Sequence, residues 1–297
     1  MFIIKHKKIF LTISLVLVLC SVISLFVFGL KIGIDFKGGA LTEVTYNTAR
    51  PLQADLETAF SQLDLGAVLI QPTGDLGYIV KSRDLNEAEH AILLNTLSLG
   101  GQNELIETNF NSIGPSVGRE LTKKAIIAII LVSLTIICFI AFAFRHVSKP
   151  VSSWRYGLIA VVALLHDVLI PIGVFVGLSH FYGVEVDTLF VVAILTILGL
   201  SVSDTIVIFD RIRENLKELG NKPYVFSEVV GRSLEQSFVR SLSTSLTIIL
   251  VLLALFFFGP VSTKYFALML ATGMFVGTYS SIFLASPLLV LSEEKDK

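Results

Sequence analysis

The chain has 297 residues, of which 54% are hydrophobic and only 16% are charged. An ordinary soluble domain carries about 25% charged residues, so this composition excludes a disordered protein, a fibrous protein and a normal cytosolic enzyme. The net charge of -1 gives no reason to expect a nucleic-acid partner.

Six long apolar segments are predicted to cross a membrane, because roughly 20 apolar residues span the hydrocarbon core. They are residues 9–30, 125–144, 157–178, 189–209, 242–258 and about 265–289. The first segment is too long for the apolar region of a secretory signal, so we expect an uncleaved span. Cys20 and Cys138 lie inside these segments. That position favours small apolar core residues over a disulfide framework or a four-ligand metal site.

The distribution of Lys and Arg predicts that both chain ends lie on the inner side of the membrane, where short loops carry an excess of positive charge. With the N-terminus inside, the inner segments hold 14 of the 23 Lys and Arg residues. Most of the others lie in or beside residues 31–124, and long segments cross a membrane largely regardless of charge.

Residues 31–118 are predicted to form one small domain on the outer side. They carry 11 Asp or Glu against five Lys or Arg, and this acidity disfavours docking on anionic lipid head groups. Alternating and helical patterns predict strands at 40–46, 66–71, 77–81 and 104–110, and helices at about 52–63 and 86–99. This β-α-β-β-α-β order is the split βαβ, or ferredoxin-like, arrangement. His90 is expected to be an isolated surface residue.

Ionisable residues inside the spans are candidates for function, since a central Asp costs about 2.5–3.5 kcal/mol to insert. His166 and Asp167 stand near the middle of the third span. Asp204 lies roughly 8 Å from the inner end of the fourth span, at 1.5 Å per residue, and Arg240 precedes the fifth span at that same end. We therefore predict a polar column that relays protons between the inner side and mid-membrane.

Each of these residues also has a structural interpretation. Asp204 and Arg240 could form an ion pair that joins two helices, and His166 could be a hydrogen-bonded core residue rather than a proton carrier. The hydroxyls near Asp204 could serve a water chain or tight helix packing; they belong to Ser201, Ser203 and Thr205.

Two further patterns concern packing. The sixth span carries a ridge of small residues that lets another helix approach closely, either from this chain or from a partner subunit. The ridge consists of Gly273, Gly277, Ser281 and Ala285. Residues 211–240 are predicted to include an amphipathic segment on the inner membrane surface, with apolar residues at every fourth position from Phe226 to Phe238.

Five motifs, in order along nearly the whole chain, resemble the SecD/SecF family of protein-export permeases. The first is residues 33–39, where Asp35, Phe36, Gly38 and Gly39 match the D-F-x-G-G signature. The others are residues 114–118, 166–169, 203–215, and 232–234 with 240–245.

The resemblance implies a polytopic α-helical membrane protein with six transmembrane helices and one small α+β ferredoxin-like periplasmic domain between the first two helices. The implied division is a cytoplasmic N-terminus with the first helix at 1–30, the periplasmic domain at 31–118 and a five-helix transmembrane domain at 119–297. The implied location is the bacterial inner membrane, with both termini cytoplasmic and residues 31–124 periplasmic.

The resemblance also implies a role in proton-driven protein export together with SecD, beside the SecYEG channel. YajC, YidC, the unfolded secretory polypeptide and the lipid bilayer are further implied partners; no cofactor, metal or nucleic acid is implied. The family's proton-path residues carry over to Asp204 and Arg240, and Asp167 and His166 match by motif. The chain has no G-x-x-x-x-G-K-[ST] sequence, and we do not expect it to be an enzyme.

Two other functions remain open from the residues alone. One is half of a proton-driven exporter of a lipid or small molecule, for which we would expect a large apolar outer domain. The other is a passive scaffold, against which the cost of burying Asp204 argues.

Overall fold

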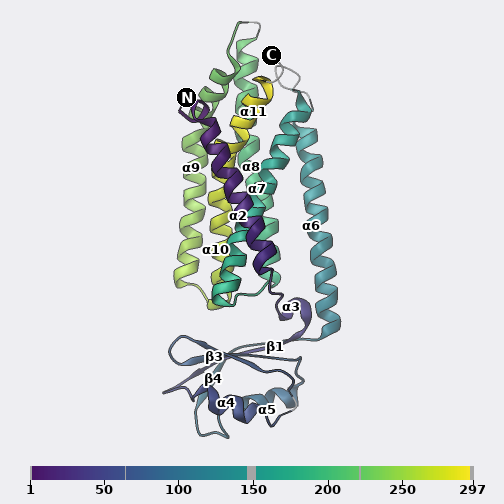
Figure 1. Cartoon of the computed structure of the whole chain (residues 1–297), viewed down its shortest axis with the longest axis vertical. Helices are drawn as coiled ribbons and strands as arrows, with labels where there is room; N and C mark the ends of the chain where they lie inside the picture. The colour runs from purple at the N-terminus through teal and green to yellow at the C-terminus, as the bar shows by residue number, and fades with distance from the viewer. Residues whose placement is uncertain (1, 64, 146–151, 221, 295–297) are drawn as a thin grey trace. The chain divides into compact units, whose positions relative to one another are not determined.

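The computed structural model describes residues 2–63, 65–145, 152–220 and 222–294. The chain divides into two compact units (Figure 1). One unit comprises residues 32–126, and the other joins residues 1–31 to residues 127–297. Each unit is described by itself below.

The unit of residues 32–126 has the β-α-β-β-α-β order that the sequence predicts. After the short helix α3 (Ile34–Lys37), its elements are β1 (Gly39–Tyr46), α4 (Gln53–Phe60), β2 (Leu69–Thr73), β3 (Gly77–Ser82), α5 (Glu87–Leu97) and β4 (Leu105–Ile113). The sheet is antiparallel throughout with strand order β2-β3-β1-β4, so the ferredoxin-like prediction is confirmed.

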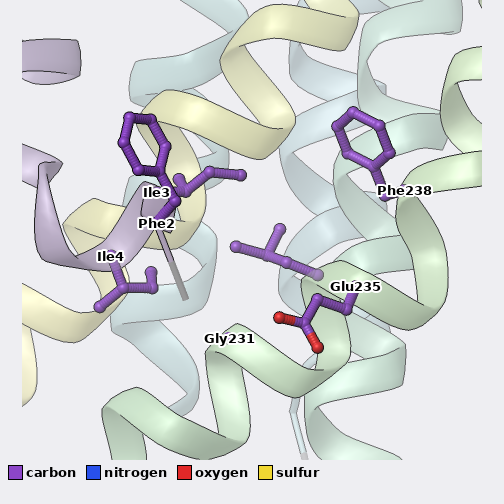
Figure 2. Close-up of a pocket in the computed structure, with 7 residues that line it drawn as sticks. Phe2, Ile3, Ile4, Gly231, Glu235 and Phe238 are labelled. Carbon is purple, nitrogen blue, oxygen red and sulfur yellow. The ribbon is translucent and has the colours of Figure 1, made fainter.

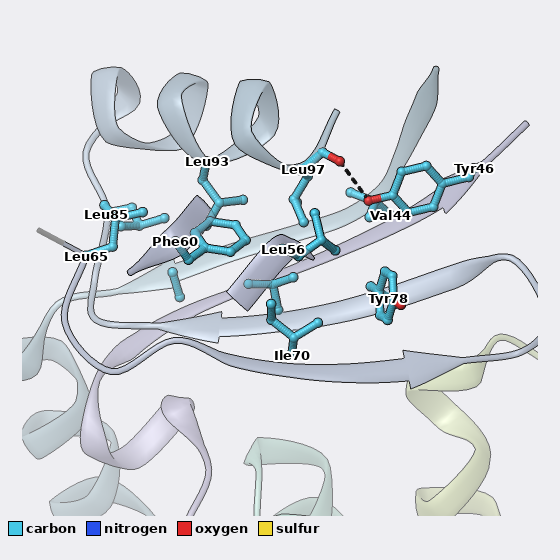
Figure 3. Packing of buried hydrophobic residues seen from close by; sticks show 12 residues of the cluster. Val44, Tyr46, Leu56, Phe60, Leu65, Ile70, Tyr78, Leu85, Leu93 and Leu97 are labelled. Atoms are coloured by element: carbon cyan, nitrogen blue, oxygen red, sulfur yellow. Dashed lines mark hydrogen bonds between the residues drawn. The ribbon is translucent and has the colours of Figure 1, made fainter. Parts of the chain in front are cut away.

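The core of this unit lies between the sheet and its two longer helices, which cover one face of the sheet (Figure 3). Leu56 of α4 and Leu93 of α5 are fully buried, opposite Val44 of β1. Tyr46 extends the same face and donates a hydrogen bond from its hydroxyl to the carbonyl of Leu97, 2.9 Å away (Figure 3). Alternate residues of β1 are buried because side chains on a strand alternate between its two faces.

His90 is not the isolated surface residue that the sequence predicts. Its Nε2 lies 2.8 Å from Oε1 of Glu107, and its ring stacks on Phe110 with centroids 3.7 Å apart. Side chains three positions apart on a strand normally point to opposite faces. Here a β-bulge, opposite Glu43 and Val44, brings both to the helix side. Sequence alternation cannot reveal such a bulge.

The other unit contains six helices long and apolar enough to cross a membrane among the described residues. Helix α1 (Phe2–Lys5) precedes α2 (Lys7–Phe28), and α6 (Pro115–Ala143) enters from the first unit. The rest are α7 (Ser153–Tyr182), α8 (Thr188–Leu219), α9 (Phe226–Phe258), α10 (Val261–Ser280), the π-helical turn η1 (Ser281–Ala285) and α11 (Ser286–Glu294).

Both ends of the chain lie at the same end of this helical unit (Figure 1). Lys7 Nζ at the start of α2 is 2.5 Å from Oε1 of Glu294 at the end of α11. An even number of crossings requires this arrangement.

The amphipathic segment predicted at 211–240 differs from expectation. It is no separate helix on the membrane surface: α8 continues to Leu219, and α9 runs unbroken from Phe226 to Phe258. At 1.5 Å per residue, α9 is about 50 Å long and exceeds the hydrocarbon core. Phe226, Val230 and Leu234 of its apolar stripe are buried within the protein, whereas Phe238 is exposed.

Burial divides the helices into two groups. The most apolar windows of α7, α8 and the α10–α11 helix are 61%, 50% and 72% buried, whereas those of α2, α6 and α9 are 6%, 6% and 11% buried. Helices α7, α8 and α10 therefore form the centre of the unit. The expectation that the cysteines are core residues was wrong, because Cys20 and Cys138 are exposed on the two least buried helices.

Candidate functional site

A buried carboxylate joins the three central helices. Asp167 of α7 has no exposed surface and accepts hydrogen bonds from the hydroxyls of Ser201 on α8 and Ser280 on α10. The Ser280 distance is 2.6 Å. Nδ1 of the neighbouring His166 lies 2.8 Å from the other carboxylate oxygen. Three donors around one carboxylate compensate much of its lost hydration.

His166 contributes a second polar atom to this interior. The residue is 4% exposed, and its Nε2 has no hydrogen-bond partner in the described part of the chain. With Nδ1 facing the carboxylate, Nε2 is the ring atom left to exchange a proton. The histidine predicted from the third span therefore lies in the same cluster as the predicted aspartate.

The π-helical turn η1 aligns two consecutive hydroxyls with different helices. Ser280 faces Asp167 of α7, whereas Ser281 lies 2.9 Å, between hydroxyl oxygens, from Thr205 of α8. Ser286 donates to the carbonyl of Ser281 five positions earlier. Single π turns in α-helices are frequent at functional sites. The sequence reveals the serines but not this turn.

Asp204 lies at the edge of the polar interior rather than inside it. Its side chain is half-buried, and its Oδ1 accepts a hydrogen bond from Ser241 of α9 over 3.3 Å. Its Oδ2 is buried, and no hydrogen-bond partner for it occurs among the residues that the structure describes. A hydrogen bond between Ser245 of α9 and Thr278 of α10 continues the polar interior across that pair. Hydroxyl side chains thus link α7, α8, α9 and α10.

Arg240 does not form the ion pair with Asp204 that the sequence left open as an alternative. Its side chain is exposed, and neither a salt bridge nor a hydrogen bond joins it to Asp204, although both residues are among those described. Ser241, the residue after Arg240, makes the contact to the carboxylate instead. The two predicted residues therefore come to neighbouring positions without neutralising each other by contact.

The ridge of small residues on the sixth span packs inside the chain. A Cβ atom at Gly273 would overlap the side chain of Ile197 on α8, and one at Gly277 would lie 3.5 Å from the Cα of Ser201. Ser281 bonds to α8, and Ala285 has no exposed surface. Of the two alternatives that the sequence leaves open, close packing within the chain is the one present here.

The motif at residues 33–39 meets the motif at residues 114–118 within the other unit. Gly38 has a φ of +83°, and a Cβ there would lie 2.9 Å from the Cα of Pro115. A Cβ at Gly118 would lie 2.9 Å from the carbonyl oxygen of Phe36. Glycine is therefore required for backbone approach at both positions. Asp35 lies in the short helix α3, and Gly39 begins β1.

The described residues offer no metal centre, and the cavity drawn in Figure 2 lies apart from the predicted site. They contain no group of three His, Cys, Asp or Glu side chains able to hold a metal ion. Figure 2 shows a small cavity between α1 and α9, lined by Phe2, Ile3, Ile4, Gly231, Leu234, Glu235 and Phe238. Glu235 is the one ionisable group in its lining, and the predicted site residues do not reach it.

Reasoning from the sequence missed Ser280 and Thr278, and it placed Ser241 in a family motif without assigning it a contact. A usable signal was present, because a hydroxyl in an apolar span either bonds to its own helix or meets a partner. Which of these occurs depends on how the helices pack, and periodicity alone does not give that packing.

Comparison with known proteins gives consistent matches. Residues 96–295 match the family model "Protein export membrane protein SecD/SecF, C-terminal", and residues 23–49 match the "SecD/SecF GG Motif". "Protein translocase subunit SecF" of Thermobaculum terrenum is 42% identical, over 99% of this chain and 94% of that protein. The same-named protein of Anaerolinea thermophila is 34% identical, over 98% and 94%.

A solved structure also matches. The crystal structure of SecDF, a translocon-associated membrane protein from Thermus thermophilus, is 30% identical with a TM-score of 0.79. The match covers 99% of this chain but only 38% of that one. The chain therefore spans little more than a third of the SecDF chain, while it spans nearly all of the relatives named SecF.

Proposed function

The chain belongs to the SecD/SecF family of protein export membrane proteins, and from this premise we propose that it is the SecF-type subunit of a proton-driven protein-export complex. Its role is in Sec protein export, as a multi-pass membrane component without enzymatic chemistry of its own. SecD is its partner. The match to a little over a third of SecDF supports a complex in which SecD supplies the remaining helices and outer domains.

The α8 and α9 helices are the proposed contact surface for SecD. Helix α8 carries Asp204 and α9 contacts it through Ser241. Both helices expose polar or small residues within apolar spans, among them Gly199, Ser203, Ser243 and Thr247. Thr247 already donates to the carbonyl of Ser243 on its own helix, and the small size of these residues lets a facing helix approach closely. This surface replaces the Gly273 ridge as the expected interface, because that ridge is already occupied by α8.

Asp204 is the proposed proton-loading residue. The observation that carries this assignment is a half-buried carboxylate in a spanning helix, whose Oδ2 has no hydrogen-bond partner within the described ranges of the chain. Intramembrane carboxylates mark proton and ion paths, and the edge of the polar interior gives protons access to this one. Arg240, exposed one residue from Ser241, supplies positive charge near the path without quenching the carboxylate by contact.

Asp167 and His166 form the proposed deeper station of the path. Asp167 accepts hydrogen bonds from hydroxyls of two other helices, so a change in its protonation alters contacts that hold α7, α8 and α10 together. One proton crossing 100 mV supplies about 2.3 kcal/mol. That free energy suffices to shift a two-position equilibrium by a factor of tens, which couples proton passage to movement of the outer domain.

The remaining parts of the proposal follow from the family. The complex lies in the bacterial inner membrane beside SecYEG, with both termini cytoplasmic and the acidic unit of residues 32–126 on the periplasmic side. Contact with YajC, YidC and the emerging secretory polypeptide belongs to the same proposal. The excess of Lys and Arg in the segments on the side of the termini supports this orientation.

The test compares Asp204→Asn with Asp204→Glu in the complex with SecD. Export into inverted membrane vesicles is measured with and without a proton gradient, at matched protein level. Asp204→Asn keeps the shape but removes the titratable group, so we expect gradient-dependent enhancement to vanish. Asp204→Glu retains a carboxylate and should keep part of the gradient-dependent enhancement. Full enhancement in Asp204→Asn would end the proton-loading assignment.

A further inference from the structure

Two buried serines distinguish α2 from a helix that only faces lipid. The most apolar window of α2 is 6% buried, yet Ser14 and Ser21 are 2% and 9% exposed. A hydroxyl buried in a spanning helix either bonds to its own backbone or meets a partner on another helix. The helix that packs along this face of α2 is α7.

The contacts between α2 and α7 keep one register. The rings of Phe28 and His180 have their centroids 4.3 Å apart. One heptad earlier on both helices, a Cβ at Gly173 would overlap the side chain of Ser21. Residue numbers rise together along these contacts, so the two helices run parallel, and a heptad step returns to the same face of each.

One further heptad step in the same register places Ser14 of α2 opposite His166 of α7. A contact from α10 supports this placement independently. The ring of Tyr279 lies nearly parallel to that of His166, with centroids 6.3 Å apart, and its hydroxyl donates to the carbonyl of Phe10 over 3.1 Å. Since Phe10 stands one helical turn before Ser14, Tyr279 contacts both the histidine and the turn of α2 that leads to the serine.

Each of these two facing side chains has a buried polar atom to satisfy. Within the part of the chain that the structure describes, neither the hydroxyl of Ser14 nor Nε2 of His166 has a hydrogen-bond partner. A helical serine can bond to the carbonyl four positions earlier, but here that carbonyl belongs to Phe10 and accepts from Tyr279. Burying a polar atom without a hydrogen bond is costly, and one water molecule between the two atoms would satisfy both.

We propose that Ser14 is a positioning residue of the proton path, whose hydroxyl holds one water molecule against Nε2 of His166. This inference rests on the proposed function, because it supplies the histidine of that path with its partner for proton exchange. A proton arriving on the water passes to Nε2, while the proton on Nδ1 passes to the carboxylate of Asp167. The ring stays neutral while one proton crosses it, so the path gains an exchange point on the α2 side of α7.

The test detects the water at His166 directly. The full chain, with isotopically labelled ring nitrogens in its five histidines, is placed in lipid bilayers, and the His166 signals are those missing from His166→Gln. Magic-angle-spinning NMR then measures magnetisation transfer from water protons to each ring nitrogen. We expect transfer to Nε2 of His166 in the wild type and its loss in Ser14→Ala, because a buried water needs about two to four polar partners and would keep only one. The Nδ1 signal should stay unchanged, which shows that the contact with Asp167 is intact.

Ser21→Ala is the matched control, because it removes a hydroxyl from the same face of α2 at a position opposite a glycine, and it should keep the water transfer. In the complex with SecD, gradient-dependent export should fall several-fold in Ser14→Ala and stay at the wild-type level in Ser21→Ala. The NMR measurement needs neither a gradient nor SecD, so its outcome is separate from that of Asp204→Asn. Absence of transfer in the wild type, equal transfer in Ser14→Ala and Ser21→Ala, or wild-type export by Ser14→Ala would overturn the proposal.

Discussion

Ser280 donates a hydrogen bond to the carboxylate of Asp167 over 2.6 Å, although 113 positions separate the two residues. The same hydroxyl lies 3.0 Å from the carbonyl oxygen of Gly277 on its own helix. A hydroxyl has one proton to donate, so it can serve the carboxylate or the carbonyl. Protonation of Asp167 would release Ser280 to Gly277 and weaken the contact between α7 and α10.

This relationship predicts the effect of Ser280→Ala. Loss of a hydrogen bond to a charged group costs roughly 1.5–3 kcal/mol, so the variant should reduce gradient-dependent export by about ten-fold or more. Ser280→Thr keeps the hydroxyl and should retain more activity. Ser286→Ala is the control, because that buried hydroxyl bonds only to the carbonyl of Ser281. Equal export by Ser280→Ala and Ser286→Ala, in vesicles with matched protein levels, would refute the coupling.

Gly277→Leu should damage the single chain rather than only its complex with SecD. The new side chain would enter the space between Ser201, whose Cα is 3.5 Å from the Cβ position, and Asp167, whose Oδ2 is 3.7 Å away. Close packing has no room for the four additional carbon atoms of a leucine side chain. We expect reduced accumulation of the chain expressed without SecD, measured by immunoblot of membranes. Normal accumulation would show that α8 and α10 can separate here without loss of structure.

Gly199→Leu should damage the complex with SecD while leaving the single chain intact, the opposite of what we expect for Gly277→Leu. A Cβ at this position of α8 meets nothing within 4 Å inside the chain, so the chain should accumulate normally. If α8 contacts a SecD helix, the larger side chain separates two backbones and the complex should dissociate in mild detergent. Co-purification of SecD with the variant at wild-type yield would place the interface elsewhere.

The sequence predicted the six spans and the outer domain well, because both depend on local patterns. Hydropathy determines a span from its own residues, and alternation determines a strand. His166, Asp167 and Asp204 could be identified as candidates for the same reason, since an ionisable residue in an apolar span is conspicuous. The strand order and the buried cluster also involve pairings between distant segments. The β-α-β-β-α-β pattern indicated the first through the split βαβ arrangement, whereas local patterns do not give the hydroxyl partners of Asp167.

The errors have physical causes that local patterns do not contain. The sequence of the small-residue ridge that begins at Gly273 is compatible with an internal or an external surface. Only the position of α8 decides between them. The apolar stripe of residues 226–238 could be buried by lipid or by protein, and three of its four residues are buried within the protein here, whereas Phe238 is exposed. His90 depended on a bulge of one residue in β4, for which the sequence gives no sign.

Gly38→Ala should destabilise the unit of residues 32–126. The substitution places a Cβ 2.9 Å from the Cα of Pro115 and demands a φ of +83° from an L-residue, a strain of about 1–3 kcal/mol before the clash is counted. Gly74→Ala is the matched control, since its φ is +54° with nothing within 4 Å. Thermal unfolding of the isolated residues 32–126, followed by circular dichroism, should show that Gly38→Ala lowers the midpoint temperature more than Gly74→Ala does. Equal falls would mean that close approach to Pro115 contributes nothing.

Tyr46 should make the stability of the same unit fall at high pH. Burial, with a smaller contribution from Tyr78, raises the pKa of the Tyr46 hydroxyl from 10.0 to about 12. Below pH 10 the tyrosine is neutral in both the folded and the unfolded state, so its contribution to stability is fully present. Above pH 10 the unfolded state loses the proton while the folded state keeps it, so unfolding becomes more favourable between pH 10 and pH 12.

The measurement is urea unfolding of residues 32–126 from pH 7 to pH 11.5. Tyr46→Phe should lower the free energy of unfolding by about 1 kcal/mol at pH 7, because the carbonyl of Leu97 loses its hydrogen bond. Above pH 10 the free energy of unfolding of this variant should decrease less steeply than that of the wild type. In Tyr78→Phe, Tyr46 is the one tyrosine left in the fragment, so its ionisation can be followed by tyrosinate absorbance. Tyrosinate formation near pH 10 with the fragment still folded would contradict the burial of this hydroxyl.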